Sequence, residues 1–172
     1  GKPYVWLTPS PSDRNADLET YLRQAAAFAR SAAFYRVETV IHNHLDQRIE
    51  TPEEIELLLE RVPEVKLLLD IGHLAMAGGD AVRMVRQYAD RIAAVHFKDV
   101  FLTGGTLPSG RAEYRFYELG AGNAANLDPQ AVALALRQCR WDGWCYIEQD
   151  HHHDDPAAEL RQSLNLLRRW LA

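Results

Sequence analysis

The stretch LLLDIGHLAMAGGD, residues 67–80, indicates the fold class of the whole chain. An unbroken apolar run ends in Asp70, His73 follows three residues later, and two glycines precede Asp80. A short, continuous apolar run is typical of a strand that is covered on both faces, as in a parallel sheet. The stretch therefore predicts a buried strand that ends in a carboxylate.

Further runs of the same kind are distributed along the chain. The predicted strands are residues 4–7, 38–41, 65–69, 92–96 and 145–147. Helical patterns separate them, and the predicted helices are residues 17–31, 51–61, 80–89, 128–138 and 155–171. The strongest helix start is Thr51-Pro52-Glu53-Glu54, in which the threonine is an N-cap and Glu54 completes a capping box.

Five strand–helix pairs in succession predict a parallel α/β architecture with right-handed crossovers. Two folds have this order: a doubly wound open sheet and part of a (β/α)8 barrel. No Gly-x-Gly-x-x-Gly follows the first strand, so a dinucleotide-binding fold has no support. Residues 1–172 are predicted to form one domain, with residues 101–126 as a long irregular segment.

The composition excludes several classes of protein. Of the 172 residues, 47% are hydrophobic and 25% are charged, which is typical of a globular domain. The net charge of -5 gives no general attraction to nucleic acid or to an anionic membrane surface. The apolar runs are shorter than the roughly 20 residues that cross a bilayer, and no signal peptide is recognised. We therefore expect a cytoplasmic protein in which Cys139 and Cys145 are reduced thiols.

Polar side chains recur where the predicted strands end. In chain order they are His42 and His44, Asp70 and His73, His96, Lys98 and Asp99, and Glu148 and Asp150. In a parallel α/β fold these ends share one edge of the sheet, where ligands bind. Taken singly, such an aspartate is as often a helix cap, and such a histidine is more often a hydrogen-bonded core residue. Recurrence at four successive strand ends predicts a shared metal site, with ligands that suit Mn, Co, Fe or Zn better than Ca or Mg alone.

Five segments carry a resemblance to a known family. DIGHLAMAGGD, RIAAVHFKDV, HNH, YIEQD and YELGAGN (residues 117–123) together resemble the xylose isomerase-like TIM barrels. That superfamily holds sugar isomerases, ketose 3-epimerases, hydroxypyruvate isomerases, inosose dehydratases and DNA-repair enzymes of the endonuclease IV type. The resemblance extends from about Tyr4 to the C-terminus. It implies a partial (β/α)8 barrel, in which the last five βα units are present and the three N-terminal units are missing.

The resemblance also implies a metal and a set of site residues. The family holds one divalent ion, here expected to be Mn, Co, Zn or Mg, at the ends of its last four strands. The matching ligand positions are His42, Asp70, His96 and Glu148. His42 stands where the family often has glutamate, so a scheme with two symmetric carboxylate bases does not carry over. The expected catalytic groups are Glu148, Lys98 and His73, and the expected substrate contacts are His44, His73 and Arg115.

The activity implied is that of a sugar isomerase or epimerase that removes a proton beside the carbonyl of a small sugar or keto-sugar. A metal would polarise the carbonyl oxygen and stabilise the negative charge that develops. Dehydration begins with the same step, so an inosose dehydratase-like lyase that acts on a cyclitol is the alternative. A non-catalytic metal-binding fragment or partner subunit is the alternative from another class. A DNA-repair activity is disfavoured, because the chain is acidic and has no run rich in lysine and arginine.

A barrel that lacks three units has two open parallel edges. We therefore expect self-association or a completing segment, or else disorder and exposed apolar side chains near residues 4–9. His151, His152 and His153 are expected in a solvated loop. Glu50 is expected either to face the site or to take part in capping the helix that follows it.

Overall fold

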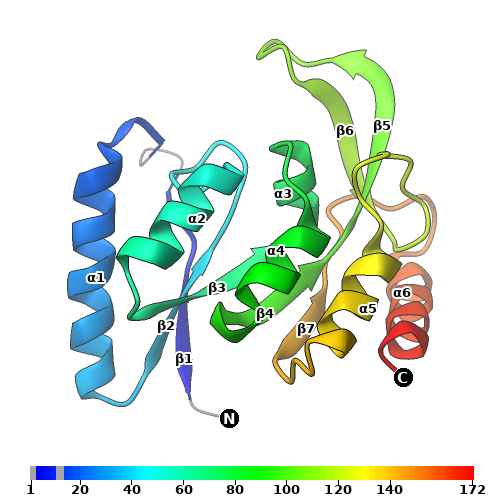
Figure 1. Cartoon of the computed structure of the whole chain (residues 1–172). Coiled ribbons are helices and arrows are strands. Elements are labelled where there is room, and N and C mark those ends of the chain that lie inside the picture. The colour runs from blue at the N-terminus through cyan, green and yellow to red at the C-terminus, as the bar shows by residue number, and fades with distance from the viewer. Residues whose placement is uncertain (1–2, 11–13) are drawn as a thin grey trace.

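A computed structural model describes residues 3–10 and 14–172. Its main sheet has five parallel strands in the order β1-β2-β3-β4-β7, and helices pack on one face of it (Figure 1). The strands are β1 (Tyr4–Leu7), β2 (Glu38–His42), β3 (Val65–Asp70), β4 (Ile92–Phe97) and β7 (Trp144–Ile147). The helices are α1 (Leu18–Phe34), α2 (Pro52–Arg61), α3 (Ile71–Met76), α4 (Ala81–Tyr88), α5 (Pro129–Gln138) and α6 (Pro156–Leu171), with a 3-10 turn at Ala89–Arg91. The predicted α/β class and the partial barrel are confirmed.

The two faces of the sheet differ in what covers them. Ile41, Leu69 and Val95 belong to the main core, together with helix residues such as Leu58 and Leu136. The opposite face, here called the open face, carries Val40, Leu68 and Ala94 as a small separate cluster, with Tyr4 and Tyr146 packed against it. Side chains on one face of a strand recur every second residue. His42, Asp70, His96 and Glu148 therefore extend the open face by one layer at the C-terminal ends of the strands.

A contact between the edge strands crosses the open face. The hydroxyls of Tyr4 in β1 and Tyr146 in β7 lie 2.5 Å apart, although the two strands are at opposite ends of the sheet order. Burial and the neighbouring Tyr146 raise the pKa of Tyr4 to about 12. The sheet is therefore curved strongly enough for side chains of its two edge strands to meet across the open face.

The predicted helix starts are confirmed by their capping hydrogen bonds. The Thr51 hydroxyl accepts from the amide of Glu54, and the Glu54 carboxylate accepts from the amide of Thr51. Four aspartate side chains accept from amides of the first turn of the helices that follow them; they are Asp17, Asp80, Asp128 and Asp155. Satisfied first-turn amides fix where each helix begins and therefore where each preceding strand end points.

The segment predicted to be irregular is largely an antiparallel hairpin. Strands β5 (Asp99–Thr106) and β6 (Ala112–Tyr117) pair with one another and extend beyond the C-terminal ends of the sheet (Figure 1). Its base is fixed by Asp99, whose Oδ2 accepts from the amide of Gly120 at 2.9 Å. Asn123 continues the pairing, since its side chain bonds to both the amide and the carbonyl of Leu102. The prediction of a loop was wrong because this pairing joins residues distant in sequence.

Residues 4–7 form strand β1, so the expected disorder there is not found, whereas the expected apolar exposure is. Trp6 in β1 is 42% exposed and Trp144 in β7 is 62% exposed. Cys139 and Cys145 are free thiols. Within the part of the chain that the structure describes, no helix is both long and apolar enough to cross a membrane.

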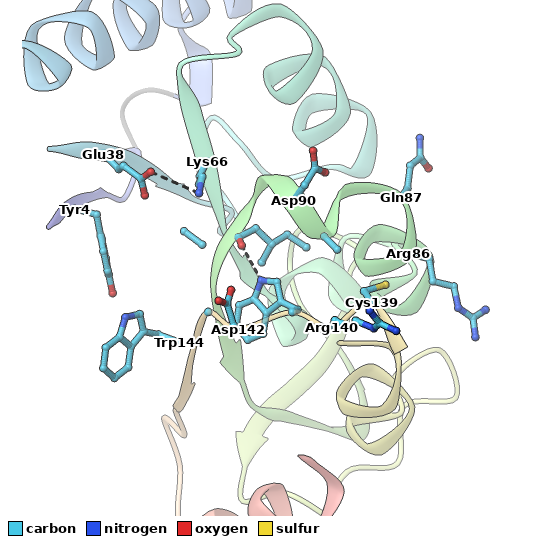
Figure 2. A pocket seen from close by; sticks show the side chains of 15 residues that line it. Tyr4, Glu38, Lys66, Arg86, Gln87, Asp90, Cys139, Arg140, Asp142 and Trp144 are labelled. Atoms are coloured by element: carbon cyan, nitrogen blue, oxygen red, sulfur yellow. Dashed lines mark hydrogen bonds and ion pairs between the residues drawn. The ribbon is translucent and has the colours of Figure 1, made fainter. Parts of the chain in front are cut away.

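The N-terminal ends of the strands border a pocket of about 660 Å³ (Figure 2). Glu38 and Lys66 form an ion pair of 3.6 Å on one side of it, and the loop between α5 and β7 forms another side. In that loop, the indole of Trp141 donates to the carbonyl of Ile92 at 2.8 Å. This hydrogen bond joins the loop to the start of β4.

Replacement of Trp141 by Phe is expected to lower the free energy of unfolding by about 1–3 kcal/mol, because the Ile92 carbonyl loses its side-chain donor. Trp144→Phe is the matched control, since Trp144 is largely exposed, and it is expected to change stability by less than about 0.5 kcal/mol. Urea unfolding of both variants measures the difference. Equal losses in the two variants would contradict the assigned role of the Trp141 hydrogen bond.

Candidate metal centre

Three of the predicted ligands converge at the C-terminal ends of neighbouring strands. His42 ends β2, Asp70 ends β3, and His96 is the residue before the last of β4. One ligand atom from each lies within 4.8 Å of the other two, and all three residues are buried. The backbones of Asp70 and His96 are in direct register across β3 and β4. The parallel pairing therefore creates the cluster.

The two oxygens of Asp70 have different partners. Oδ1 accepts from the amide of His73 at 2.8 Å and caps α3, a short helix that the sequence did not predict. Oδ2 lies 3.4 Å from Nε2 of His42 and 3.6 Å from Nδ1 of His96. The sequence presented helix capping and metal binding as alternatives, but the geometry allows one oxygen for each.

Asn43 fixes the backbone at this point. Its side-chain oxygen accepts from the Asp70 amide at 2.8 Å, and its nitrogen donates to the Asp70 carbonyl at 3.1 Å. These bonds join the ends of β2 and β3 and leave the carboxylate free to face the cluster. The amide between His42 and His44 is therefore a structural part of the site that sequence reasoning missed.

His42 is oriented from its outer side. The hydroxyl of Thr8 lies 3.4 Å from its Nδ1 and also accepts from the indole of Trp6 at 2.9 Å. A partner on one ring nitrogen directs the other nitrogen toward the metal position. The Trp6 ring packs edge-on to His96, with 4.9 Å between the ring centroids, and partly covers the cluster. Neither Thr8 nor Trp6 has a sequence signal for this role.

Lys98 and Glu148 complete the cluster. Nζ of Lys98 lies 3.2 Å from Oδ2 of Asp70 and 3.0 Å from Oε1 of Glu148. Oε2 of Glu148 is in close contact with Nδ1 of His96. Lys98 is completely buried, so its ammonium group depends on these carboxylates for compensation.

The pKa values follow from this arrangement. Burial alone would raise the pKa of Asp70, but the neighbouring imidazoles and Lys98 hold it well below its usual value. Burial acts in the same direction on Glu148, where His96 and Lys98 outweigh it and lower the pKa to about 2. For Lys98 burial favours the neutral form, but Asp70 and Glu148 prevail and raise the pKa. At neutral pH the cluster therefore holds two carboxylates and one ammonium.

The pKa values of two histidines in the cluster are shifted in opposite directions. Burial lowers the pKa of His73 to about 3, so the ring is neutral. For His96 the carboxylates of Asp70 and Glu148 outweigh burial and raise the pKa. His44 stacks beside His73 with 3.8 Å between ring centroids, and its Nδ1 donates to the carbonyl of Leu45 at 2.7 Å.

The donor set fits a divalent ion. Nδ1 of His96 and Oε2 of Glu148 contact one another without forming a regular hydrogen bond, and Nε2 of His96 is buried without a hydrogen-bond partner among the described residues. Buried polar atoms of this kind are normally satisfied, and an ion bound by Nδ1 and Oε2 would satisfy two of them. Two imidazoles with two carboxylates are a typical set for Zn, Mn, Co or Fe.

Other predicted residues lie apart from the cluster. The Arg115 guanidinium donates to the carbonyl of Tyr114 and to Glu113, so it is engaged within β6. Glu50 neither faces the cluster nor caps α2 through its side chain, which pairs instead with Arg14 and Arg111. Of the three consecutive histidines, His152 and His153 are exposed, as expected for a loop, and the His153 ring stacks on Tyr117.

Comparison with known proteins gives one family. Residues 1–170 match the family model described as xylose isomerase-like TIM barrel. The rhizopine catabolism protein MocC of Rhizobium meliloti is 37% identical over 179 residues, which cover 96% of this chain and 54% of that protein. An inosose dehydratase of Lacticaseibacillus casei is 28% identical over 130 residues, which cover 70% of this chain and 42% of that enzyme. The chain thus spans about half the length of the curated relatives that it matches.

Solved structures agree on the fold. A crystal structure of the IolI protein with a bound zinc atom superposes with a TM-score of 0.71 at 16% identity, over 98% of this chain and 63% of that one. A D-allulose 3-epimerase from Methylomonas sp. superposes with a TM-score of 0.73 at 16% identity, over 98% of this chain and 63% of that one. Both superpositions show similarity of fold only.

Removal of a ligand is expected to abolish stable metal binding. Asp70→Ala and His96→Ala should each lower the metal retained after dialysis by at least about tenfold, since ligand loss exceeds the effect of losing an outer partner. Elemental analysis measures the retained metal. His152→Ala serves as control, because this exposed imidazole lies in the loop after β7. Unchanged metal content in both ligand variants would refute the site.

Proposed function

The chain belongs to the xylose isomerase-like TIM barrel family, and on that premise we propose that it carries the metal-binding and proton-transfer side of an enzyme active site. The substrate class is a small sugar or cyclitol ketone, and the reaction begins with removal of the proton beside the carbonyl. The observation that carries this proposal is the placement of Lys98 between the carboxylates of Asp70 and Glu148, beside two imidazoles.

The proposed metal ligands are His42, Asp70, His96 and Glu148. A divalent ion bound there would act as a Lewis acid toward the carbonyl oxygen. Zinc is present in the IolI structure and magnesium in another family structure, from Mycobacterium smegmatis, so the identity of the ion in this chain is part of the proposal.

The side chains have separate proposed tasks. Glu148 is ionised at neutral pH and accepts the proton, and its basicity rises when a bound ligand draws Lys98 or His96 away from it. Lys98 is charged and can donate a proton to a developing alkoxide or leaving hydroxide. His73, which is neutral, lies beside Lys98, His44 lies beside His73, and both orient the hydroxyl groups of the substrate. Arg115 remains a proposed substrate contact, one that needs release from Glu113.

Two outcomes can follow proton removal. Isomerisation or epimerisation returns a proton to the substrate, whereas dehydration expels hydroxide. A second candidate function, an inosose dehydratase-like lyase, is favoured by a specific feature: the cluster pairs one carboxylate base with one ammonium acid, rather than two carboxylates on opposite sides. The inosose dehydratases among the relatives support the same alternative.

Proton removal can be measured before the final product is known. In D₂O with Zn, Mn, Co or Mg, an inosose or D-allulose should lose the NMR signal of the hydrogen beside its carbonyl. Glu148→Gln should slow this loss by about 10²–10⁴-fold, the usual contribution of a general base. Lys98→Met should slow any accompanying loss of hydroxide more than it slows hydrogen exchange.

His152→Ala is the control for these variants, because it changes an exposed residue outside the cluster. Absence of exchange for both ketones with every metal, in a chain that binds metal, would contradict the enzyme proposal. It would support the alternative of a non-catalytic metal-binding fragment or partner subunit.

The unpaired edges of β1 and β7 affect how the proposed substrate pocket is enclosed. β1 and β7 each have one pairing partner in the sheet, and Trp6 and Trp144 are exposed on them. We propose that a second copy of the chain or a completing segment covers these edges in a cytoplasmic protein. Size-exclusion chromatography with light scattering should show a dimer or larger species for this chain alone. A monodisperse monomer at micromolar concentration would contradict self-association.

A further inference from the structure

We propose that Phe116, in strand β6 of the hairpin, is a positioning residue that holds the ammonium group of Lys98 in the cluster. The residue lies in the segment that the sequence predicted to be irregular, and nothing in the sequence linked it to the site. The consequence for catalysis rests on the proposed function, because it needs Lys98 to take part in proton transfer. The contact between Phe116 and Lys98 does not depend on that role.

The ring of Phe116 faces the end of the Lys98 side chain. Nζ lies 4.6 Å from the ring centroid, while the same atom is 3.2 Å from Oδ2 of Asp70. Lys98 is completely buried and Phe116 is 3% exposed, so the contact is shielded from water. A cation over an aromatic face is attracted most strongly when both are desolvated. The ring therefore compensates part of the ammonium charge in addition to the carboxylates.

A glycine on α3 shapes the space for this contact. A Cβ at Gly72 would lie 2.5 Å from Cγ of Lys98 and 3.0 Å from the ring of Phe116. The aliphatic stem of Lys98 thus passes over the bare backbone of Gly72, and the Phe116 ring borders the same space. A side chain at position 72 would displace both.

The same ring also packs against His73. The two ring centroids are 5.0 Å apart at an angle of 82°, so the imidazole meets Phe116 edge to face. Nε2 of His73 lies 3.4 Å from Nζ of Lys98. Phe116 therefore contacts both Lys98 and the imidazole beside it.

Backbone contacts hold Phe116 itself in place. Val100 of β5 pairs with it in the hairpin register. Its carbonyl accepts from the amides of Asp150 at 3.2 Å and His151 at 3.0 Å, in the loop that follows Glu148. The ring is thus fixed to two elements that come from different parts of the chain.

If Phe116 had only a structural role, it would need only to fill the small apolar cluster in which it is buried. That core contains Leu45, Val100 and Ala124, with Tyr114 packed against it. A leucine at position 116 would still be apolar there but would present no aromatic face to Lys98. The test therefore needs a signal that depends on the ring and not on stability alone.

Lysine NMR supplies that signal, because the sequence has three lysines, Lys2, Lys66 and Lys98. With ¹³C-labelled lysine, the ε-methylene of Lys98 should be shifted upfield by the ring current of Phe116, and Lys98→Arg identifies it by its loss. The shift should disappear in Phe116→Leu and persist in Tyr114→Leu, which removes a ring from the same core. Tyr114 packs 5.0 Å from Phe116.

Three ε-methylene signals at ordinary positions in the wild-type protein would overturn the proposal, even if Phe116→Leu failed to fold. Persistence of the shift in Phe116→Leu would also overturn it. The upfield shift should be present in spectra of both the metal-free and the zinc-loaded protein.

Hydrogen exchange of the ketone in D₂O tests the catalytic consequence. At saturating ketone, Phe116→Leu should lower the rate about tenfold or more with retained metal and with a smaller change in KM, whereas Tyr114→Leu should stay within about twofold. An unchanged rate in Phe116→Leu would overturn the positioning role. A wild-type protein without exchange would contradict the proposed function instead, and the NMR shift would then decide the position of Lys98 by itself.

Discussion

The carboxylate of Asp70 must remain ionised in the interior of the protein, and much of the surrounding structure meets that requirement. An unpaired charge removed from water is far more costly than the whole stability of a domain, so it needs hydrogen bonds and counter-charges. The chain supplies the His73 amide to one oxygen, and His42, His96 and Lys98 to the other. These groups come from β2, α3, β4 and the residue after β4. The carboxylate is therefore stabilised only when the ends of β2 and β4 have come together with the β3–α3 junction.

The alternation of side chains along the strands explains why these groups meet. Val40, Leu68 and Ala94 form an apolar layer on the open face, and two residues later the same strands present His42, Asp70 and His96. The layer excludes water beneath the cluster and so strengthens every charge interaction above it. The chain spans about half the length of the MocC and inosose dehydratase relatives, yet it contains all four positions expected to bind the ion.

The β5–β6 hairpin supplies a contact to Lys98 that the main sheet does not provide. Lys98 follows β4 directly and pairs with Asp70 and Glu148. The Phe116 ring lies near its ammonium group, and the bare backbone of Gly72 borders its aliphatic stem. The carbonyl of Phe116 also accepts hydrogen bonds from two amides of the loop after Glu148. The hairpin between β4 and α5 thus contacts the cluster at the strand ends, the side on which loops of parallel α/β proteins commonly carry functional residues.

The sequence by itself determined the parallel strands, the helix starts and the ligand-type residues at the strand ends. Each of these depends on local pattern: continuous apolar runs, capping aspartates such as Asp80, and polar residues directly after a buried strand. Only the tertiary structure decided the β5–β6 hairpin, the short helix α3, and the roles of Asn43, Thr8 and Phe116. These depend on pairing and packing between segments up to tens of residues apart. Short-range patterns hold no information on such contacts, because the partner of each residue is set by how the whole chain folds.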